Sequence, residues 1–159
     1  MAKWTRKVEV EGKEREKILD RAAKVIRTWG LTMPEVFPAF VLDFGLRNFA
    51  VIGHTEYWIA NEEEEEYCGK FIFMFDGQSC PAHQHLKKHE TFFVVKGTVV
   101  MHLPTGDLPM KPGHVLPMDR KTVHGFTAQG DSLILEVSLP SMPKDNIFRE
   151  KRIGTKGVV

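Results

Sequence analysis

Hydrophobic residues recur with a helical period near the start of the chain. Between residues 13 and 29 apolar side chains fall three or four positions apart, Lys and Glu occupy the positions between them, and Gly30 stands where a helix can end. We therefore predict one amphipathic helix, whose apolar face consists of Ile18, Leu19, Ala22, Val25, Ile26 and Trp29. The next segment, MPEVFPAF, contains Pro34 and Pro38 and is predicted to cross to the rest of the fold in an extended conformation.

The remainder of the chain has the pattern of an all-β protein. Short runs rich in Phe, Val, Ile and Thr are separated by glycines at intervals typical of turns. Many short antiparallel strands imply a sandwich or a barrel. The runs predict strands at residues 50–52, 56–59, 70–75, 80–85, 91–95, 98–103, 114–117, 122–127 and 133–139.

Composition supports one globular domain and narrows the choice of partners. The 159 residues are 42% hydrophobic and 27% charged, a balance typical of a folded domain. Because 22 Lys and Arg nearly cancel 21 Asp and Glu, we expect a small-molecule partner and no binding to nucleic acid or to a membrane. Within the single domain 1–159 we expect the helix and crossing segment at 1–40, the barrel at 41–139, and at 140–159 a surface tail that can close one mouth of the barrel.

Neither a signal sequence nor a disulfide framework is evident. The N-terminal residues lack an apolar signal core and no run is long enough to span a bilayer, so a cytoplasmic location is expected. Two cysteines are too few for a disulfide framework. We expect Cys68 and Cys80 to be reduced and buried, with a single bridge between them left open.

Three histidines and one glutamate form a candidate metal site. His83 and His85 are two positions apart, and on a strand this spacing points both imidazoles to the same face. Glu90 begins the next strand, and His124 lies on a later strand that a barrel would bring beside the pair. Three imidazoles and a carboxylate suit a divalent first-row ion with open coordination positions. We expect Mn²⁺, with Zn, Fe, Co and Ni as alternatives; His54, His89, His102 and His114 lack ligand spacing and are interpreted as surface or hydrogen-bonded residues.

The spacing of these ligands resembles the cupin superfamily. The first cupin motif is matched at every fixed position, by Gly77, His83, His85, Glu90 and Gly97. The second motif is kept in part: Gly113 and His124 stand at the family's spacing, whereas Asp119, Lys121 and Ala128 replace its usual Pro, Gly and Asn. The resemblance implies a cupin double-stranded β-helix, or jelly-roll barrel, preceded by the N-terminal α-helix.

A narrower pattern resembles the D-lyxose ketol-isomerases among the cupins. Lys88 stands between the ligands, as His83-x-His85-x-x-Lys88-x-Glu90. Further landmarks of that family follow in order: DFGL at 43–46, YCGK at 67–70, GQSCP at 77–81, ETF at 90–92, LEVS at 135–138, and DNIF at 145–148 followed by Arg152 and Ile153. The resemblance covers roughly two thirds of the chain. It implies a metal-dependent aldose–ketose isomerase that acts on a free sugar, D-lyxose/D-xylulose or D-mannose/D-fructose, through an enediol.

The resemblance also suggests roles for individual residues. Lys88 would donate a proton to the substrate oxygen as negative charge develops there. Strand alternation places Glu136 on a polar face of 133–139, where it is the candidate base, although that face could instead be solvated. Asp145 and Arg152 are candidates for binding sugar hydroxyls or for ordering a lid over the pocket, with ordinary surface positions as the alternative.

Two other functions stay open at this point. Three histidines and a glutamate also suit an iron-dependent cupin dioxygenase. A cupin that binds a small molecule without turnover is the second alternative, and neither a catalytic lysine nor a base is needed for it. By family resemblance we expect a homodimer.

Overall fold

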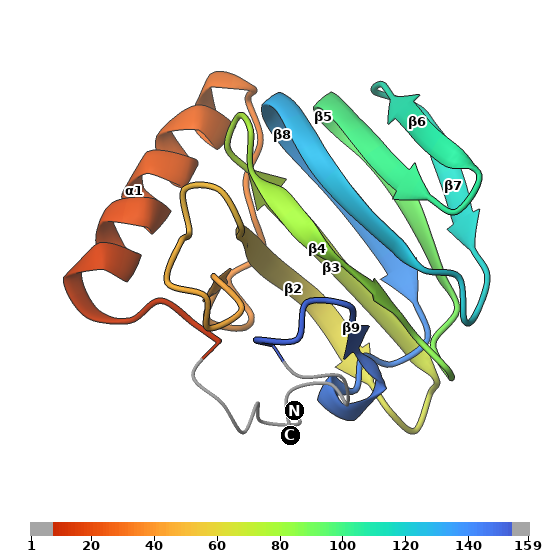
Figure 1. Ribbon diagram of the computed structural model, residues 1–159. Helices are drawn as coiled ribbons and strands as arrows, with labels where there is room; N and C mark the ends of the chain where they lie inside the picture. The colour runs from red at the N-terminus through yellow and green to blue at the C-terminus, as the bar shows by residue number, and fades with distance from the viewer. Residues whose placement is uncertain (1–7, 154–159) are drawn as a thin grey trace.

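The computed structural model describes residues 8–153, and the outermost parts of the expected helical segment 1–40 and tail 140–159 lie outside these residues. One helix precedes a set of strands that form a single curled, antiparallel sheet (Figure 1). The elements in chain order are α1 (Gly12–Thr28), β1 (Phe40–Leu42), β2 (His54–Glu62), β3 (Tyr67–Met74), β4 (Ser79–Gln84), β5 (Glu90–Leu103), β6 (Gly106–Met110), β7 (Val115–Met118), β8 (His124–Ser138), a 3₁₀ turn (Pro143–Asp145) and β9 (Ile147–Phe148). The all-β prediction is confirmed.

Two long strands connect the two sides of the barrel. The first part of β8 pairs with β4, its second part pairs with β3, and β5 runs beside β8 over nearly its whole length. The order β1-β2-β3-β8-β4-β9, with β5 linking β6, β7 and β8, curls the sheet around one interior. The sequence predicted two separate strands in place of β5 and again in place of β8, because the glycines between them suggested turns.

Gly97 allows β5 to bend without ending. Its φ of +76° lies in the left-handed region, and a Cβ there would contact the Ser132 side chain and lie 2.5 Å from the carbonyl oxygen of Asp131. The register between β5 and β8 shifts on both sides of Lys96, next to this glycine. The motif glycine is therefore a bend at which two strands approach closely, and not a hairpin turn.

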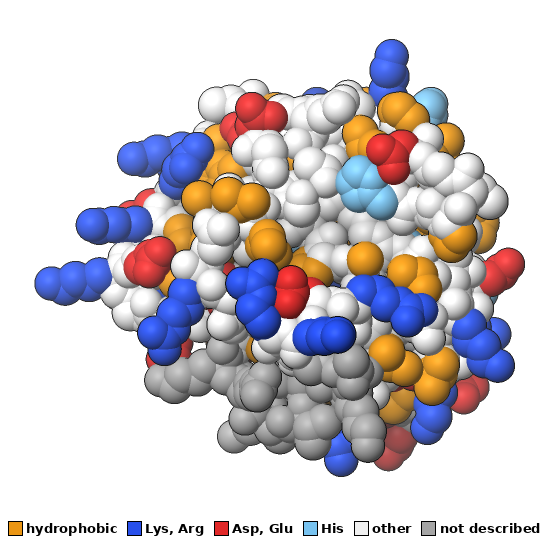
Figure 2. Space-filling view, in the orientation of Figure 1, with side chains coloured by type: hydrophobic (Ala, Val, Ile, Leu, Met, Phe, Trp, Pro, Cys, Tyr) orange, Lys and Arg blue, Asp and Glu red, His pale blue; other side chains and the backbone are white. Residues whose placement is uncertain are grey.

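Helix α1 covers part of the outer face of the sheet. Its residues Ala22 and Ile26 are buried against Phe73, Phe75 and Leu133 (Figure 1). The Gly30 amide donates to the carbonyl oxygen of Arg27, and its φ of +69° ends the helix as the sequence predicted. Figure 2 shows Lys and Arg side chains of this region projecting into solvent with Asp and Glu among them, which fits the near-zero net charge.

Several strand predictions need correction. Residues 50–52 form a turn with one isolated bridge from Ile52 to Ser79, because the backbone must reverse before β2. The crossing segment ends in β1, and β6 was not predicted because Asp107 and Pro109 interrupt its apolar pattern. The tail does more than cross the surface: β9 pairs with β4. Among residues 8–153 no helix is long and apolar enough to cross a membrane.

Both cysteines are buried and free, as expected. The bridge that was left open is absent between Cys68 and Cys80. Burial raises the pKa of each thiol above its usual range, so both are held in the protonated form.

Candidate metal centre and active site

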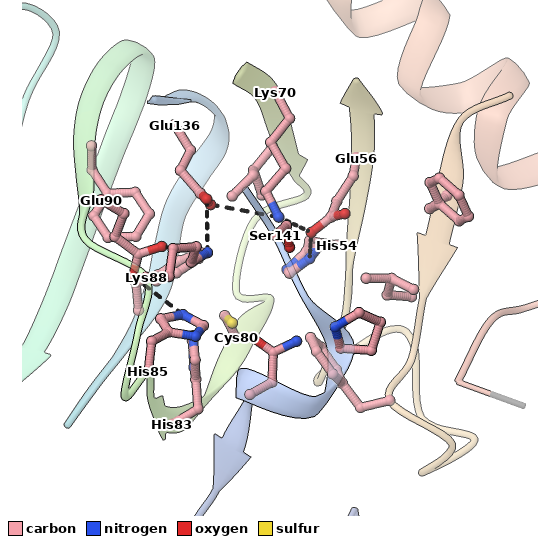
Figure 3. Close-up of a pocket in the computed structure, with 18 of the residues that line it drawn as sticks. His54, Glu56, Lys70, Cys80, His83, His85, Lys88, Glu90, Glu136 and Ser141 are labelled. Atoms are coloured by element: carbon pink, nitrogen blue, oxygen red, sulfur yellow. Dashed lines mark hydrogen bonds and ion pairs between the residues drawn. The ribbon is translucent and has the colours of Figure 1, made fainter. Parts of the chain in front are cut away.

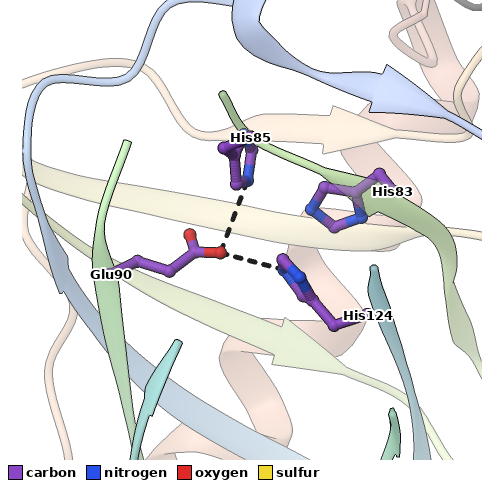
Figure 4. A group of neighbouring side chains, drawn as sticks. All are labelled: His83, His85, Glu90 and His124. Carbon is purple, nitrogen blue, oxygen red and sulfur yellow. Dashed lines mark ion pairs between the residues drawn. The ribbon is translucent and has the colours of Figure 1, made fainter. Parts of the chain in front are cut away.

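The four predicted ligands meet at one end of the barrel interior (Figure 4). His83 on β4 is the register partner of His124 at the start of β8, and Glu90 begins β5. His85 follows β4 directly. Each residue offers a ligand atom within 4.8 Å of every other, and the exposed fractions are 8%, 3%, 1% and 1% for His83, His85, Glu90 and His124. Residues 41 positions apart in the chain are thus brought together by strand pairing.

Backbone carbonyls orient the three imidazoles. In each ring Nδ1 lies at hydrogen-bond distance from a carbonyl oxygen, which can only accept, so Nδ1 carries the proton and Nε2 presents a lone pair. The contacts join His83 to Pro81 (2.8 Å), His85 to Asp145 (3.2 Å) and His124 to Thr122 (2.9 Å). Three lone pairs therefore point into the cluster.

The cluster has the unsatisfied atoms expected around a cation. Nε2 of His85, Nε2 of His124 and Oε1 of Glu90 are buried without a hydrogen-bond partner. The two nitrogens lie 3.4 and 2.9 Å from that carboxylate oxygen, but these approaches do not have hydrogen-bond geometry. Lone pairs that face one another in a buried site repel unless a cation lies among them. The donor set therefore fits a divalent ion.

The ionisation of the ligands also suits a metal. Burial, together with the neighbouring His124 and His85, lowers the pKa of His83 well below its usual range, which keeps the ring neutral. Burial alone would raise the pKa of Glu90, but the neighbouring Lys88 ammonium outweighs it and lowers that pKa well below its usual range. A neutral imidazole and an ionised carboxylate are the forms that bind metal.

Lys88 and Glu136 lie beside the ligands, inside the same cavity (Figure 3). Nζ of Lys88 is 2.7 Å from Oε2 of Glu90 and donates to Oε1 of Glu136 at 2.9 Å. The Ser138 hydroxyl donates to the same Glu136 oxygen. Glu136 is only 2% exposed, so its face of β8 is the pocket face and not a solvated one. Burial lowers the pKa of Lys88, but Glu136 and Glu90 more than compensate and raise it, so the ammonium is retained.

A second polar group, on β2 and β3, was missed by the sequence analysis. His54, Glu56, Trp58 and Lys70 all line the cavity and are buried. Lys70 lies 2.8 Å from Glu56 and 3.6 Å from Glu136, which connects this group to Lys88. His54 was interpreted as a surface or hydrogen-bonded residue, and it is the latter. The available signal was the alternation HTEYW, which places His54, Glu56 and Trp58 on one strand face.

The cavity combines these polar groups with aromatic walls. The empty space between its walls and at its open mouth, solvent included, amounts to about 720 Å³. Its apolar lining includes Phe40, Leu42, Phe44, Ile72, Phe92, Phe126 and Phe148. A mainly apolar concave site with a few convergent polar groups is typical of small-molecule binding.

The tail places its two candidate residues differently. The carboxylate of Asp145 accepts hydrogen bonds from the backbone amides of Leu86, Lys87 and Lys88 at 2.9 to 3.1 Å. It thus lies under the loop that carries Lys88. Arg152 is exposed, is not among the residues that line the cavity, and pairs with Glu150 at 3.0 Å.

Comparison with known proteins identifies the barrel. Residues 71–138 match the family model described as Cupin domain. This part of the barrel is a cupin domain. Over nearly its whole length the chain also resembles two bacterial L-ribose isomerases in structure. A variant from Acinetobacter sp. DL28 in complex with L-ribose superposes with a TM-score of 0.75 at 16% identity, over 95% of this chain and 97% of that one. The enzyme from Cellulomonas parahominis gives a TM-score of 0.73 at 17% identity, over 97% and 98%.

Curated relatives confirm the resemblance to D-lyxose ketol-isomerases. A protein of that name from Cohnella laeviribosi is 27% identical, with 94% of this chain and 98% of the relative covered. A second, from Thermofilum sp. (strain ex4484_79), is 28% identical over 71% and 77% of the two chains. A D-lyxose/D-mannose isomerase from Thermosediminibacter oceani is 27% identical with the same coverage.

Proposed function

We propose that this cupin domain is a metal-dependent aldose–ketose isomerase that acts on a free sugar, D-lyxose/D-xylulose or D-mannose/D-fructose. The observation that carries the proposal is the position of Glu136 and Lys88, hydrogen-bonded to each other in the cavity that His83, His85 and Glu90 of the four-residue cluster also line. The similarity to D-lyxose ketol-isomerases supports the same reaction. His83, His85, Glu90 and His124 would hold the ion, for which we propose Mn²⁺.

Glu136 is proposed as the group that moves the carbon-bound proton. Its carboxylate would take the proton from C2 of the aldose. The electron pair of the broken C2–H bond then forms the C1=C2 double bond of an enediol, and the carbonyl oxygen gains a proton. Return of the carbon-bound proton to C1, with loss of the O2 proton, yields the ketose. The bonds from Lys88 and Ser138 hold the carboxylate in place for this transfer.

Lys88 is proposed as the donor to the substrate oxygen. Its raised pKa keeps it charged, and it lies between Glu90 and Glu136, so it can supply a proton as negative charge develops and recover one from the O2 hydroxyl. A bound divalent ion would add Lewis acidity toward the oxygens of the substrate.

Asp145 is proposed as a positioning residue. Three backbone amides of the Lys88 loop donate to its carboxylate, and its own carbonyl oxygen accepts from His85. One tail residue therefore orients both a ligand and the loop of the proposed donor. The pairing of Arg152 with Glu150 supports a role for Arg152 in keeping the C-terminal tail ordered.

The test is incubation of Mn²⁺-loaded protein with D-lyxose, D-xylulose, D-mannose and D-fructose in deuterated water. We expect interconversion of at least one aldose–ketose pair, with solvent deuterium appearing at C1 or C2. Glu136→Gln should lower kcat by about 10²- to 10⁴-fold while the metal content is unchanged. If the protein binds metal stoichiometrically and no sugar reacts, the isomerase proposal is refuted. Oxygen uptake by the iron-loaded protein would instead indicate a dioxygenase, and binding of a small molecule without turnover would indicate a sensor.

A further inference from the structure

The β2–β3 side of the cavity carries a polar group that the proposed reaction does not use. Figure 3 shows His54, Glu56 and Lys70 across the cavity from His83, His85 and Glu90. The centre of this group is the carboxylate of Glu56, which is 7% exposed. Its Oε1 accepts from Lys70 at 2.8 Å and lies 3.1 Å from Nε2 of His54, and its Oε2 accepts from Nε1 of Trp58 at 3.0 Å.

The Glu56–Lys70 pair keeps both an unused hydrogen-bond acceptor, on Glu56, and an unused donor, on Lys70. A carboxylate has about four lone-pair sites, and the three contacts of Glu56 leave one of them. An ammonium has three N–H groups; Lys70 donates one to Glu56, and Glu136 is 3.6 Å away. A free donor therefore lies next to a free acceptor. A hydroxyl, which donates and accepts, matches that pair.

The charges of the cavity disfavour an anionic ligand at this side. Lining carboxylates belong to Glu56, Glu90 and Glu136, and lining ammonium groups to Lys70 and Lys88. Each lysine lies between two carboxylates, at 2.8 and 3.6 Å for Lys70 and at 2.7 and 2.9 Å for Lys88. The described residues of the lining include no arginine. A phosphate needs cations that are not already neutralised, and its charge would lie against Glu56.

The charged form of the pair is stable. Burial would raise the pKa of Glu56, but Lys70 and His54 outweigh burial and lower it well below its usual range. Burial would lower the pKa of Lys70, but Glu136 and Glu56 outweigh it and raise that pKa. Trp58 supports the ammonium further, because Nζ of Lys70 lies 4.9 Å from the centre of its ring.

We infer that Glu56 and Lys70 form a subsite for the terminal hydroxyl of an unphosphorylated sugar chain, and that this subsite excludes sugar phosphates. The inference rests on the proposed isomerase, in which the carbons that react lie beside Lys88 and Glu136. Lys70 lies 3.6 Å from the proposed base Glu136, so a hydroxyl further along a chain that reacts at Glu136 is within reach of the β2–β3 group. A hydroxyl satisfies the pair, whereas a methyl leaves buried polar atoms unpaired and a phosphate adds repulsion.

The first test compares three substrates on the Mn²⁺-loaded, unmodified protein: D-lyxose, 5-deoxy-D-lyxose and D-lyxose 5-phosphate. We expect kcat/KM to fall on the order of 10²-fold when the terminal hydroxyl is removed, and at least as much when it is phosphorylated. Equal kcat/KM for D-lyxose and either analogue would overturn the subsite and leave the isomerase intact. If neither these sugars nor the D-mannose/D-fructose pair is turned over, both the subsite and the proposed isomerase are refuted.

The second test locates the effect at Glu56. Glu56→Gln should lower kcat/KM for D-lyxose, mainly through KM, and the further loss on removing the terminal hydroxyl should then shrink to less than about threefold. Glu62→Gln is the matched control, an exposed residue on the same strand, and should behave as the unmodified protein does. If the loss of kcat/KM caused by Glu56→Gln and the loss caused by the deoxy sugar multiply, the two changes act independently, and Glu56 does not bind the terminal hydroxyl. Because the substrate comparison needs no variant, it stands even if Glu56→Gln folds poorly.

Discussion

At the scale of single residues, chemistry in this protein is decided by immediate neighbours. Three buried histidines become potential ligands because a backbone carbonyl holds each Nδ1. The three carboxylates that line the cavity have different surroundings: Glu90 faces histidines and Lys88, Glu136 faces both lysines, and Glu56 faces Lys70, His54 and Trp58. Of these three, Glu90 belongs to the cluster that could hold a metal ion. The residue type alone would not distinguish them.

Glu56 should make stability depend on pH in the acid range. Its pKa in the folded protein lies well below the value of about 4.3 for an unfolded glutamate. Its contribution is therefore full above about pH 5 and is lost as pH falls through the unfolded pKa toward the folded one. We expect the free energy of unfolding of metal-free protein, from denaturant titrations between about pH 5 and 3, to fall more steeply in the unmodified protein than in Glu56→Gln. Parallel slopes for the two, or the same flattening in Glu62→Gln, would contradict this.

At the scale of elements, the loop between β4 and β5 depends on the tail. It carries Lys88 and joins two strands that provide ligands, yet its backbone amides are satisfied by Asp145, 57 to 59 positions later in the chain. The tail is itself tied to the barrel by the pairing of β9 with β4. Loop and tail therefore form one unit over the cavity.

Asp145→Asn should loosen this unit while metal still binds. The amide would replace one acceptor oxygen with a donor that faces backbone N–H groups, at a cost of about 1–3 kcal/mol for the buried groups left unpaired. We expect faster hydrogen exchange at residues 86–88 and a kcat lowered by roughly tenfold. Asp107→Asn, on exposed β6, is the control. Unchanged exchange at 86–88 would exclude the positioning role.

The bend of β5 at Gly97, beside β8, gives a prediction about stability. Gly97→Ala would force a Cβ against Ser132 and Asp131 at a positive φ, and we expect a loss of roughly 1–3 kcal/mol in the free energy of unfolding. Gly69→Ala on β3 is the control, because its Cβ would meet nothing nearer than 3.7 Å. Denaturant titrations of both variants measure the difference. Equal losses would show that the bend tolerates a side chain.

At the scale of the whole molecule, the cluster of His83, His85, Glu90 and His124 would couple metal binding to folding. Its donors come from β4, β5 and β8 and from the segment after β4, so the site exists only when these strands are paired. An ion that binds the folded state stabilises it by mass action, by about 2.7 kcal/mol at a hundred times Kd. Unpairing the barrel would disperse the ligands.

Mn²⁺ should therefore raise the melting temperature of the protein. With about 2.7 kcal/mol of stabilisation we expect a rise of roughly 5–10 °C over protein treated with a chelator, measured by scanning calorimetry. His124→Gln should lose most of this response, since it removes one of four ligands. His102→Gln, which changes an exposed residue of β5, should keep it. A rise of the same size in both variants would place the ion elsewhere.

Local patterns were sufficient for part of this protein. The helical period located α1 and its end at Gly30, and the two-residue spacing of His83 and His85 put both rings on one side. Alternation along β8 placed Glu136 on the face that lines the cavity. These features depend on the geometry of one helix or one strand, which the order of side chains determines directly.

Tertiary structure alone decided the rest. Whether the glycines near β5 and β8 were turns or bends depended on the pairing of distant strands, and so did the identity of the residues opposite the metal cluster. Glu56 and Lys70 are ordinary charged residues until β2 pairs with β3 and the sheet curls, which buries both and brings Lys70 beside Glu136. The sequence of a strand determines which of its side chains point to the same face. The curvature of the sheet and the register between strands arise from contacts between strands, and they determine which inward-facing residues meet.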